Sequence, residues 1–339
     1  MHQIHIHEMF MEQDILKINN FSVEINANYG KISAVKNINL LIKKGFTLGL
    51  VGESGCGKTV LSKSIMRLNP ENKVDYSGEI IWSDNYDNKI NILNIKQFGK
   101  EIQNIRGNKI GMVFQEPNSS LSMVHTVGDQ IEEGLKTHTL MNSKEIKDKT
   151  IELIGMVGIP NPKKVYHSYP FELSGGMKQR VVIAMAIICQ PKLLIADEPT
   201  TALDVTVEAD ILRLLKSLKE KYNMSMMIIS HDLGVIAKVS DYVAVMYMGR
   251  IVEYGNINQI FNNAKHPYTK ALQNSMPKIE FSKDKFNTIA GSIPDPFMKI
   301  EGCEFYDRCE NRIKDKCNKE KINSKNLGEN HIVRCINHK

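Results

Sequence analysis

The sequence has no long hydrophobic run. Its longest uninterrupted apolar segment is VVIAMAIIC at 181–189, whereas a helix that spans a bilayer needs about 20 apolar residues. The first residues also lack the cationic start and apolar stretch of a secretory signal. We therefore expect a chain that does not cross a membrane, that begins with a tail at 1–14, and that works in the cytoplasm, where thiols stay reduced.

Dense blocks of basic residues are also absent. Lysine and arginine number 44 against 38 aspartate and glutamate residues, which gives a formal net charge of +6. An excess this mild is typical of an ordinary solvated surface and does not indicate nucleic-acid binding. The sequence shows no internal repeat, and its 339 residues suffice for one large domain with an appendage or for two domains.

A glycine-rich loop lies between a predicted strand, FTLGLV at 46–51, and a predicted helix. The loop, GESGCGKT at 52–59, matches G-x-x-x-x-G-K-[ST], which binds nucleotide phosphates in this context. Glycines let successive amides point inward, and the helix N-terminus favours an anion. We expect Lys58 to reach the β- and γ-phosphates and Thr59 to offer its hydroxyl to Mg²⁺. The predicted nucleotide-binding residues are Gly52, Glu53, Ser54, Gly55, Cys56, Gly57, Lys58, Thr59 and Val60.

Two adjacent carboxylates end another apolar segment, in KLLIADEPTTALD at 192–204. A buried strand here would place both side chains at its C-terminal end, where open α/β sheets bind ligands. We expect Asp197 to hold Mg²⁺ and Glu198 to polarise a water molecule toward the γ-phosphate. Since side chains alternate along a strand, the two carboxylates need not share one role.

A third segment, YPFELSGGMKQR at 169–180, narrows the class of protein. LSGG followed by MKQR resembles the signature of the ATP-binding-cassette (ABC) ATPases, and the resemblance runs from about residue 15 to 275. It implies ATP hydrolysis in a dimer, with each ATP between the phosphate loop of one subunit and the signature of the other. The signature would open a helix whose amides face a phosphate. The residues expected to contact ATP across the dimer are Leu173, Ser174, Gly175, Gly176 and Met177.

Four more residues match motifs of the same family. Tyr29 in NYGKISAV matches the aromatic residue that stacks on adenine, and Gln115 in GMVFQEP matches a glutamine that contacts Mg²⁺ or water. Asp204 in TALD matches the D-loop aspartate at the dimer interface, and His231 in MIISHDL matches the histidine that contacts the γ-phosphate. The resemblance implies the catalytic residues Lys58, Gln115, Glu198 and His231, and the Mg²⁺ ligands Thr59, Gln115 and Asp197.

The expected fold is α/β, a P-loop NTPase with a RecA-like core, an antiparallel β edge and a helical lobe. Residues 15–277 form the ATP-binding domain, and apolar residues at helical spacing place the helical lobe at about 121–180. Prolines and charged residues then mark a linker. Residues 278–339 are expected to form a small separate module that contains four cysteines.

Two segments resemble the C-terminal extension of ATPases that drive oligopeptide and dipeptide importers. They are HPYTKAL at 266–272 and IPDPF at 293–297, the latter followed by GCEFYDRC. The resemblance implies a peripheral subunit on the cytoplasmic face of the cell membrane. Its partners would be two permeases, an extracytoplasmic solute-binding protein and a second, nonidentical ATPase. The alternative is the same motor in a nickel or other small-solute importer. A cassette that acts on nucleic acid would carry long coiled coils or two cassettes, and the sequence has neither.

The C-terminal cysteines are Cys303, Cys309, Cys317 and Cys335, spaced C-x5-C-x7-C-x17-C. This spacing matches neither the short knuckle of zinc sites nor the ferredoxin run, so it does not choose a metal. Four thiolates suit Zn²⁺ or a [4Fe–4S] cluster, a reducing compartment disfavours disulfides, and thiols without a metal are the third alternative. Resemblance to importer ATPases implies the cluster. His331 and His338 flank Cys335. Both are alternative ligands by residue type, but we expect both at the surface.

Overall fold

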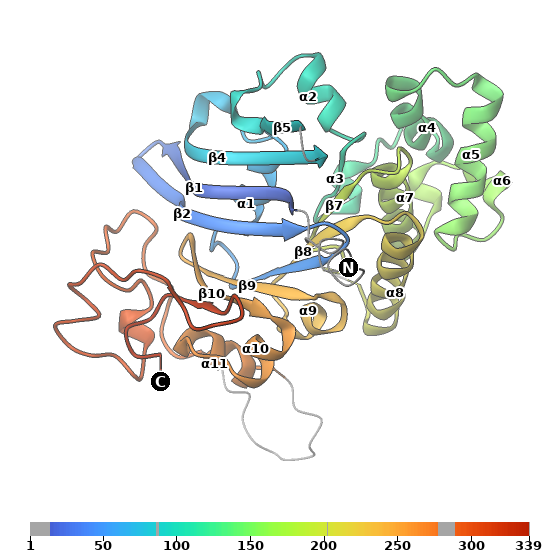
Figure 1. Cartoon of the computed structure of the whole chain (residues 1–339). Helices are drawn as coiled ribbons and strands as arrows, with labels where there is room; N and C mark the ends of the chain where they lie inside the picture. The colour runs from blue at the N-terminus through green and yellow to red at the C-terminus, as the bar shows by residue number, and fades with distance from the viewer. Residues whose placement is uncertain (1–13, 86–87, 202, 277–288, 339) are drawn as a thin grey trace, which may run out of the picture.

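The structure, a computed structural model, describes residues 14–85, 88–201, 203–276 and 289–338. Nearly all of the expected N-terminal tail and the expected domain boundary at 277 lie outside the described residues. Two sheets form the framework, one with the strand order β2-β1-β4-β5 and the other with the order β11-β12-β10-β9-β3-β8-β7-β6. Figure 1 shows the helical lobe beside these sheets, and the expected α/β fold class is confirmed.

The first sheet is antiparallel and packs on one face of the second. Ile18, Ile38 and Trp82 are fully buried and share a core with Leu50 and Ile229 of the second sheet. Alternating apolar side chains along long strands favour this arrangement, in which one face is covered and the other meets solvent. Its strands are β1 (Asp14–Ala27), β2 (Gly30–Lys43), β4 (Val74–Asn85) and β5 (Asn88–Asn91).

The centre of the second sheet is parallel and carries the nucleotide motifs. Every residue of β3, β6, β7 and β8 is buried, as expected for short apolar strands covered on both faces. The carboxyl ends of parallel strands meet at one edge, where α/β folds bind ligands. The strands are β3 (Thr47–Val51), β6 (Ile110–Val113), β7 (Leu193–Asp197), β8 (Ser225–Ser230) and β9 (Tyr242–Tyr247), followed by the antiparallel β10 (Arg250–Asn256).

Helices cover the other face of this sheet and form the lobe, drawn in green in Figure 1. The lobe contains α3 (Pro117–Ser120), α4 (Val127–His138), α5 (Ser143–Met156), α6 (Pro162–Tyr166), η3 (Pro170–Glu172) and α7 (Gly175–Ile187). The remaining helices are α1 (Lys58–Ile65), η1 (Glu71–Lys73), η2 (Ile92–Asn94), α2 (Lys100–Ile105), α8 (Val205–Lys221), α9 (Leu233–Val239), α10 (Ile257–Asn262), α11 (Pro267–Asn274) and η4 (Tyr306–Arg308).

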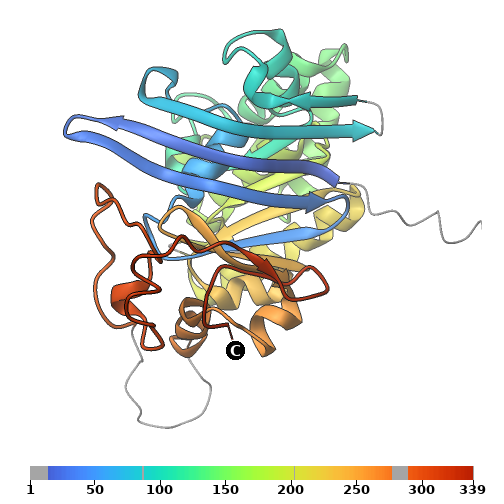
Figure 2. The same cartoon turned by 60° about the vertical axis from the view of Figure 1, so that its left-hand side comes forward.

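Residues 289–338 lie against the ATP-binding domain (Figure 2). Their strand β12 (Ile332–Val333) pairs with β10 and with β11 (Lys325–Asn326), so this region extends the main sheet. Phe305, which is 2% exposed, belongs to the same apolar core as Tyr247 and Tyr268.

We expected His331 at the surface, and this expectation is wrong because a buried carboxylate binds its side chain. Glu253 on β10 is fully buried and accepts hydrogen bonds from the backbone N–H groups of Lys265 and His266. Its Oε1 also lies 2.8 Å from Nε2 of His331, which is only 3% exposed. A buried carboxylate requires polar partners, and this one draws His331 away from solvent.

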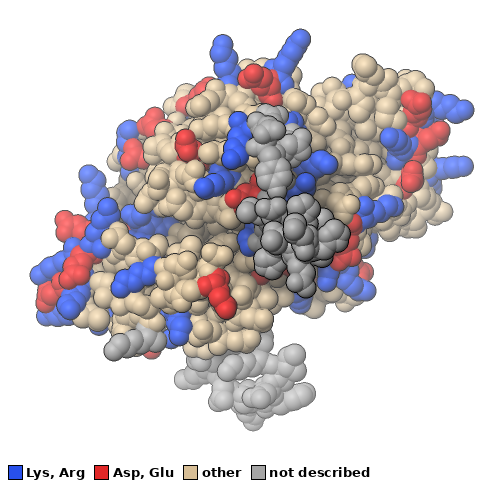
Figure 3. Space-filling model, in the orientation of Figure 1, with Lys and Arg blue, Asp and Glu red and all other residues tan. Residues whose placement is uncertain are grey.

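Within the described ranges, no helix is both long and apolar enough to span a bilayer. On the face drawn in Figure 3, basic and acidic side chains are interspersed. This distribution agrees with the ordinary solvated surface that the composition predicts.

Candidate functional site

The phosphate loop opens onto a cavity of about 400 Å³ at the edge where β3 and β7 end. Lys58, Thr59, Gln115 and Glu198 all line it, so the structure brings together residues from three predicted motifs. A volume of this size is within the usual range for small-molecule sites. The other lining residues are Ile25, Ile32, Ser33, Ala34, Lys36, Ser54, Gly55, Gly57, Val60, Met248, Gly249 and Pro296.

Two glycines of the loop have no tolerated replacement. Gly57 has a φ of 106°, and a Cβ there would lie 2.3 Å from the carbonyl oxygen of Ala34. A Cβ on Gly52 would lie 2.1 Å from the carbonyl oxygen of Met246. These contacts are shorter than any van der Waals separation, so the loop backbone can follow this path only with glycine.

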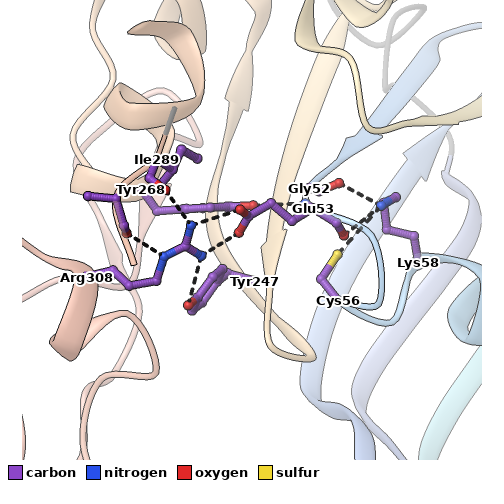
Figure 4. Close-up of polar contacts among 9 residues, drawn as sticks. Gly52, Glu53, Cys56, Lys58, Tyr247, Tyr268, Ile289 and Arg308 are labelled. Carbon is purple, nitrogen blue, oxygen red and sulfur yellow. Dashed lines mark hydrogen bonds and ion pairs between the residues drawn. The ribbon is translucent and has the colours of Figure 1, made fainter. Parts of the chain in front are cut away.

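Lys58 is buried beneath the loop that it serves. Its Nζ donates hydrogen bonds to the carbonyl oxygens of Gly52 at 2.7 Å and Glu53 at 3.0 Å, and lies 3.8 Å from Sγ of Cys56 (Figure 4). These carbonyl contacts hold the ammonium group near the N-terminus of α1, where a bound phosphate would also contact the helix amides. Burial raises the pKa of the Cys56 thiol, which favours its interpretation as a small filler.

Asp197 lies at the end of β7, beside the first turn of α1. Its two carboxylate oxygens accept hydrogen bonds from Thr59 Oγ1 at 3.4 Å and from Ser62 Oγ at 3.2 Å. Burial raises the pKa of the Asp197 carboxyl, and the two hydroxyl donors oppose that shift. The pairing of a hydroxyl and a carboxylate oxygen is the ligand chemistry that Mg²⁺ prefers.

Glu198 contacts three other polar side chains. Its Oε2 accepts hydrogen bonds from Gln115 Nε2 at 3.1 Å and Thr201 Oγ1 at 2.9 Å, and lies 3.3 Å from His231 Nδ1. Glu198 also has a φ of 48°, which turns the chain as the strand ends. The structure therefore places two predicted catalytic residues, Gln115 and His231, beside the carboxylate of a third, although the three positions span more than a hundred residues of the sequence.

The signature and the D-loop lie apart from this cavity. Ser174 caps α7 by accepting a hydrogen bond from the backbone N–H of Met177 at 3.4 Å, and Gly175 is exposed with open space around it. Asp204 caps α8 and accepts from the backbone N–H groups of Thr206 and Val207. None of these described residues lines the cavity around Lys58.

Tyr29 also lies outside the cavity lining. It occupies the turn between β1 and β2 and is 93% exposed, so its predicted stacking on adenine stays a prediction. Sequence reasoning missed Pro296, which reaches the cavity from the C-terminal region, and the partner role of Thr201. Pro296 belongs to the segment IPDPF, but nothing in that segment indicates a contact with this cavity. Thr201 was visible in the D-loop segment, but its contact with Glu198 was not.

The C-terminal cysteines come together in space. Cys303, Cys309, Cys317 and Cys335 are all buried free thiols, and all four line one small cavity. Burial raises the pKa of Cys303 to about 12 and that of Cys335 to about 11. Thiols with such pKa values stay protonated at neutral pH unless a bound cation stabilises the thiolate. In the part of the chain that the structure describes, no group of three or more His, Cys, Asp or Glu residues is spaced to hold a metal ion.

Known proteins resemble this chain in sequence and in fold. The family model "ABC transporter" matches residues 35–201, and "Oligopeptide/dipeptide transporter, C-terminal region" matches 252–317. The dipeptide transport ATP-binding protein DppD of Bacillus subtilis is 43% identical over 304 residues, which cover 89% of this chain and 88% of DppD. The oligopeptide transport ATP-binding protein AppD of the same organism is 44% identical, with coverage of 89% and 90%.

Two solved structures share the fold. A dimeric ATP-binding cassette in a post-hydrolysis state with ADP and Pi has a TM-score of 0.62 and 29% identity, covering 71% of this chain and 98% of its own. CbiO1 of Clostridium perfringens, part of an ABC transporter complex, has a TM-score of 0.61 and 29% identity, covering 74% and 92%.

The phosphate loop, the carboxylate pair and the fold together define an ATP-hydrolysing cassette. The chain belongs to the ABC transporter family, among the ATP-binding proteins that carry the oligopeptide/dipeptide transporter C-terminal region. The family resemblance and the ATPase activity expected from the sequence are thereby confirmed.

Proposed function

We propose that this chain is the ATP-hydrolysing subunit of a peptide importer. The observation that carries the proposal is the pair of family matches on one chain, an ABC transporter cassette and a C-terminal region of the oligopeptide/dipeptide type. In the cassette, Gln115 and His231 contact Glu198. Relatives over 40% identical are named as dipeptide and oligopeptide transport ATP-binding proteins. The subunit acts at the cytoplasmic face of the membrane with two permeases, a solute-binding protein and a second ATPase.

Hydrolysis requires a water molecule aligned with the γ-phosphate, and Glu198 is the base that takes its proton. Gln115 and His231 lie within hydrogen-bonding distance of the same Glu198 oxygen and orient it. Thr59 and Asp197 would hold Mg²⁺, which neutralises phosphate charge when bound. Lys58 supplies a fixed positive charge beneath the loop.

A second cassette completes the site. The exposed helix N-terminus at Ser174 lies on the helical lobe, away from the cavity around Lys58, so its amides reach a phosphate only on another subunit. A solved relative is a dimer. Ser174→Tyr should leave ATP binding by the isolated chain unchanged and abolish ATPase activity of the assembled importer, as measured by phosphate release. Full activity in that variant would refute the composite site.

The transported solute is tested by uptake. A strain that lacks this gene should lose uptake of labelled dipeptides or oligopeptides and regain it when the gene is restored. The strain should keep its Ni²⁺ uptake. Loss of Ni²⁺ uptake with peptide uptake intact would favour the nickel importer instead.

The four C-terminal cysteines are proposed to hold a [4Fe–4S] cluster. The donor set fits, since four buried thiols line one cavity and burial makes the free thiolates unfavourable there. No group of three or more His, Cys, Asp or Glu among the described residues is spaced to hold a metal ion, so the choice of the cluster over zinc rests on the family resemblance. Anaerobic purification should yield about four iron and four sulfide per chain. A colourless protein with stoichiometric zinc, or with no metal, would overturn this assignment.

A further inference from the structure

The C-terminal region makes a direct ion pair with the phosphate loop. Arg308, in the short helix η4, donates from Nη1 to Glu53 Oε2 at 2.7 Å and from Nη2 to Glu53 Oε1 at 2.9 Å (Figure 4). Two parallel hydrogen bonds between a guanidinium group and a carboxylate form the strongest and most directional kind of ion pair. The two residues are 255 positions apart in the sequence.

Arg308 is held on all sides. Its side chain is only 4% exposed, and it also donates hydrogen bonds to the carbonyl oxygens of Ala290 at 3.0 Å and Ile289 at 3.4 Å. The guanidinium carbon lies 5.8 Å from the ring centres of Tyr247 and Phe305. Its Nη1 also donates to the hydroxyl oxygen of Tyr247 at 3.4 Å. A long side chain with this many contacts has little rotamer freedom left, so it can fix the position of the carboxylate that it binds.

The backbone of Glu53 is fixed as well. Its N–H donates to the hydroxyl oxygen of Tyr268 at 2.9 Å, and Tyr268 is fully buried on α11. On its other side, the Glu53 carbonyl oxygen accepts the hydrogen bond from Lys58. A single residue therefore contacts Arg308 through its side chain and Lys58 through its backbone.

We propose that Arg308 is a positioning residue for ATP, acting through Glu53. By binding the Glu53 carboxylate, Arg308 fixes the start of the phosphate loop. This also fixes the Glu53 carbonyl group, which accepts a hydrogen bond from Lys58. It also balances a negative charge that would otherwise lie uncompensated beside the polyphosphate of ATP. The helix η4 lies between Cys303 and Cys309, so one short segment joins the cysteine cavity to the phosphate loop.

The test compares Arg308→Met with a matched control, Arg334→Met, in the full-length chain. Arg334 is also a buried arginine next to a cysteine, but its partner is Glu304 at 2.5 Å and not a residue of the loop. Both variants should lose similar thermal stability. Arg308→Met should weaken Mg·ATP binding by about tenfold, the size expected when charge-assisted hydrogen bonds are lost. Arg334→Met should change it by less than about twofold.

The route through Glu53 is tested in a Glu53→Gln background. There, adding Arg308→Met should change the Mg·ATP dissociation constant by less than about twofold, because its partner charge is already gone. Arg308→Lys keeps the positive charge but cannot form the two parallel hydrogen bonds, so it should give an intermediate loss of Mg·ATP affinity. If Arg308→Met does not fold, Arg308→Lys in the two backgrounds decides the question. Equal affinity loss in Arg308 and Arg334 variants, or the same loss with and without Glu53, would reduce Arg308 to a structural role.

Discussion

At the scale of single residues, two neighbouring carboxylates in the site have different polar partners. Asp197 is buried against hydroxyl donors, and Glu198, one residue later, meets an amide, a hydroxyl and an imidazole. The strand β7 ends at Asp197, and the φ of 48° at Glu198 turns the chain there, so the two side chains point to different neighbours. One carboxylate therefore suits a cation and the other a water molecule.

Glu198→Gln should bind ATP and hydrolyse it slowly. The amide keeps the size of the side chain and cannot accept a proton, so we expect turnover to fall by about 10² to 10⁴. ATP affinity should stay within about twofold, since the phosphate loop is untouched. Phosphate release by the assembled importer measures the first effect, and equilibrium ATP binding measures the second. Glu220→Gln, an exposed change on α8, serves as the control, and unchanged turnover in Glu198→Gln would rule out its role as the base.

At the scale of elements, one helix cap responds to pH. His266 is the N-cap of α11, and its Nδ1 accepts the hydrogen bond from the backbone N–H of Tyr268 at 3.1 Å. The residue is buried, and burial lowers its pKa from 6.5 to about 3. The cap therefore requires a neutral imidazole. In the unfolded chain, the same imidazole takes up a proton below the ordinary pKa of histidine.

The folded state should lose stability as the pH falls below about 6.5. His266 then binds a proton in the unfolded chain but stays neutral in the folded chain. The loss should approach about 1.4 kcal/mol for each pH unit down to pH 5. His266→Asn keeps a good capping group without a titratable ring. The free energy of unfolding of this variant, measured in urea, should therefore decrease less steeply with falling pH than that of the wild type. Exposed His167→Asn is the control. Parallel pH curves for wild type and His266→Asn would contradict the assignment.

At the scale of the whole molecule, the C-terminal region and the ATP-binding domain share one core. The Phe305 ring packs against the rings of Tyr247 and Tyr268, both at 5.3 Å between centres, and β12 extends the main sheet. Burial of this kind makes the two regions stabilise each other. The ion pair between Arg308 and Glu53 adds a polar contact to the same interface.

Phe305→Ala should destabilise the entire chain by about 3–5 kcal/mol, the usual cost of removing a buried aromatic ring. The loss should appear as one cooperative shift in urea unfolding, monitored by circular dichroism, since the ring lies between two regions. Phe98→Ala removes a ring that is 80% exposed, and should change stability by less than about 0.5 kcal/mol. An early, separate transition in Phe305→Ala would show that the C-terminal region unfolds independently.

Much of the site could be predicted because its motifs are local. The loop at 52–59 needs glycines and a following helix, and the strand before Asp197 needs only a run of apolar residues. The burial of His331 could not be predicted, since it depends on Glu253 on β10, 78 positions away. The contact of Pro296 with the ATP cavity escaped prediction for the same reason.

By itself, the sequence determined the glycine-rich loop before a helix, the buried strand that ends in a carboxylate, and the family that carries these motifs together. Backbone torsion and strand periodicity act over a few residues, so short segments specify them. Only the tertiary structure decided which distant side chains meet, as Arg308 meets Glu53 and His331 meets Glu253. Such contacts depend on how whole elements pack, and no local pattern of residues encodes that packing.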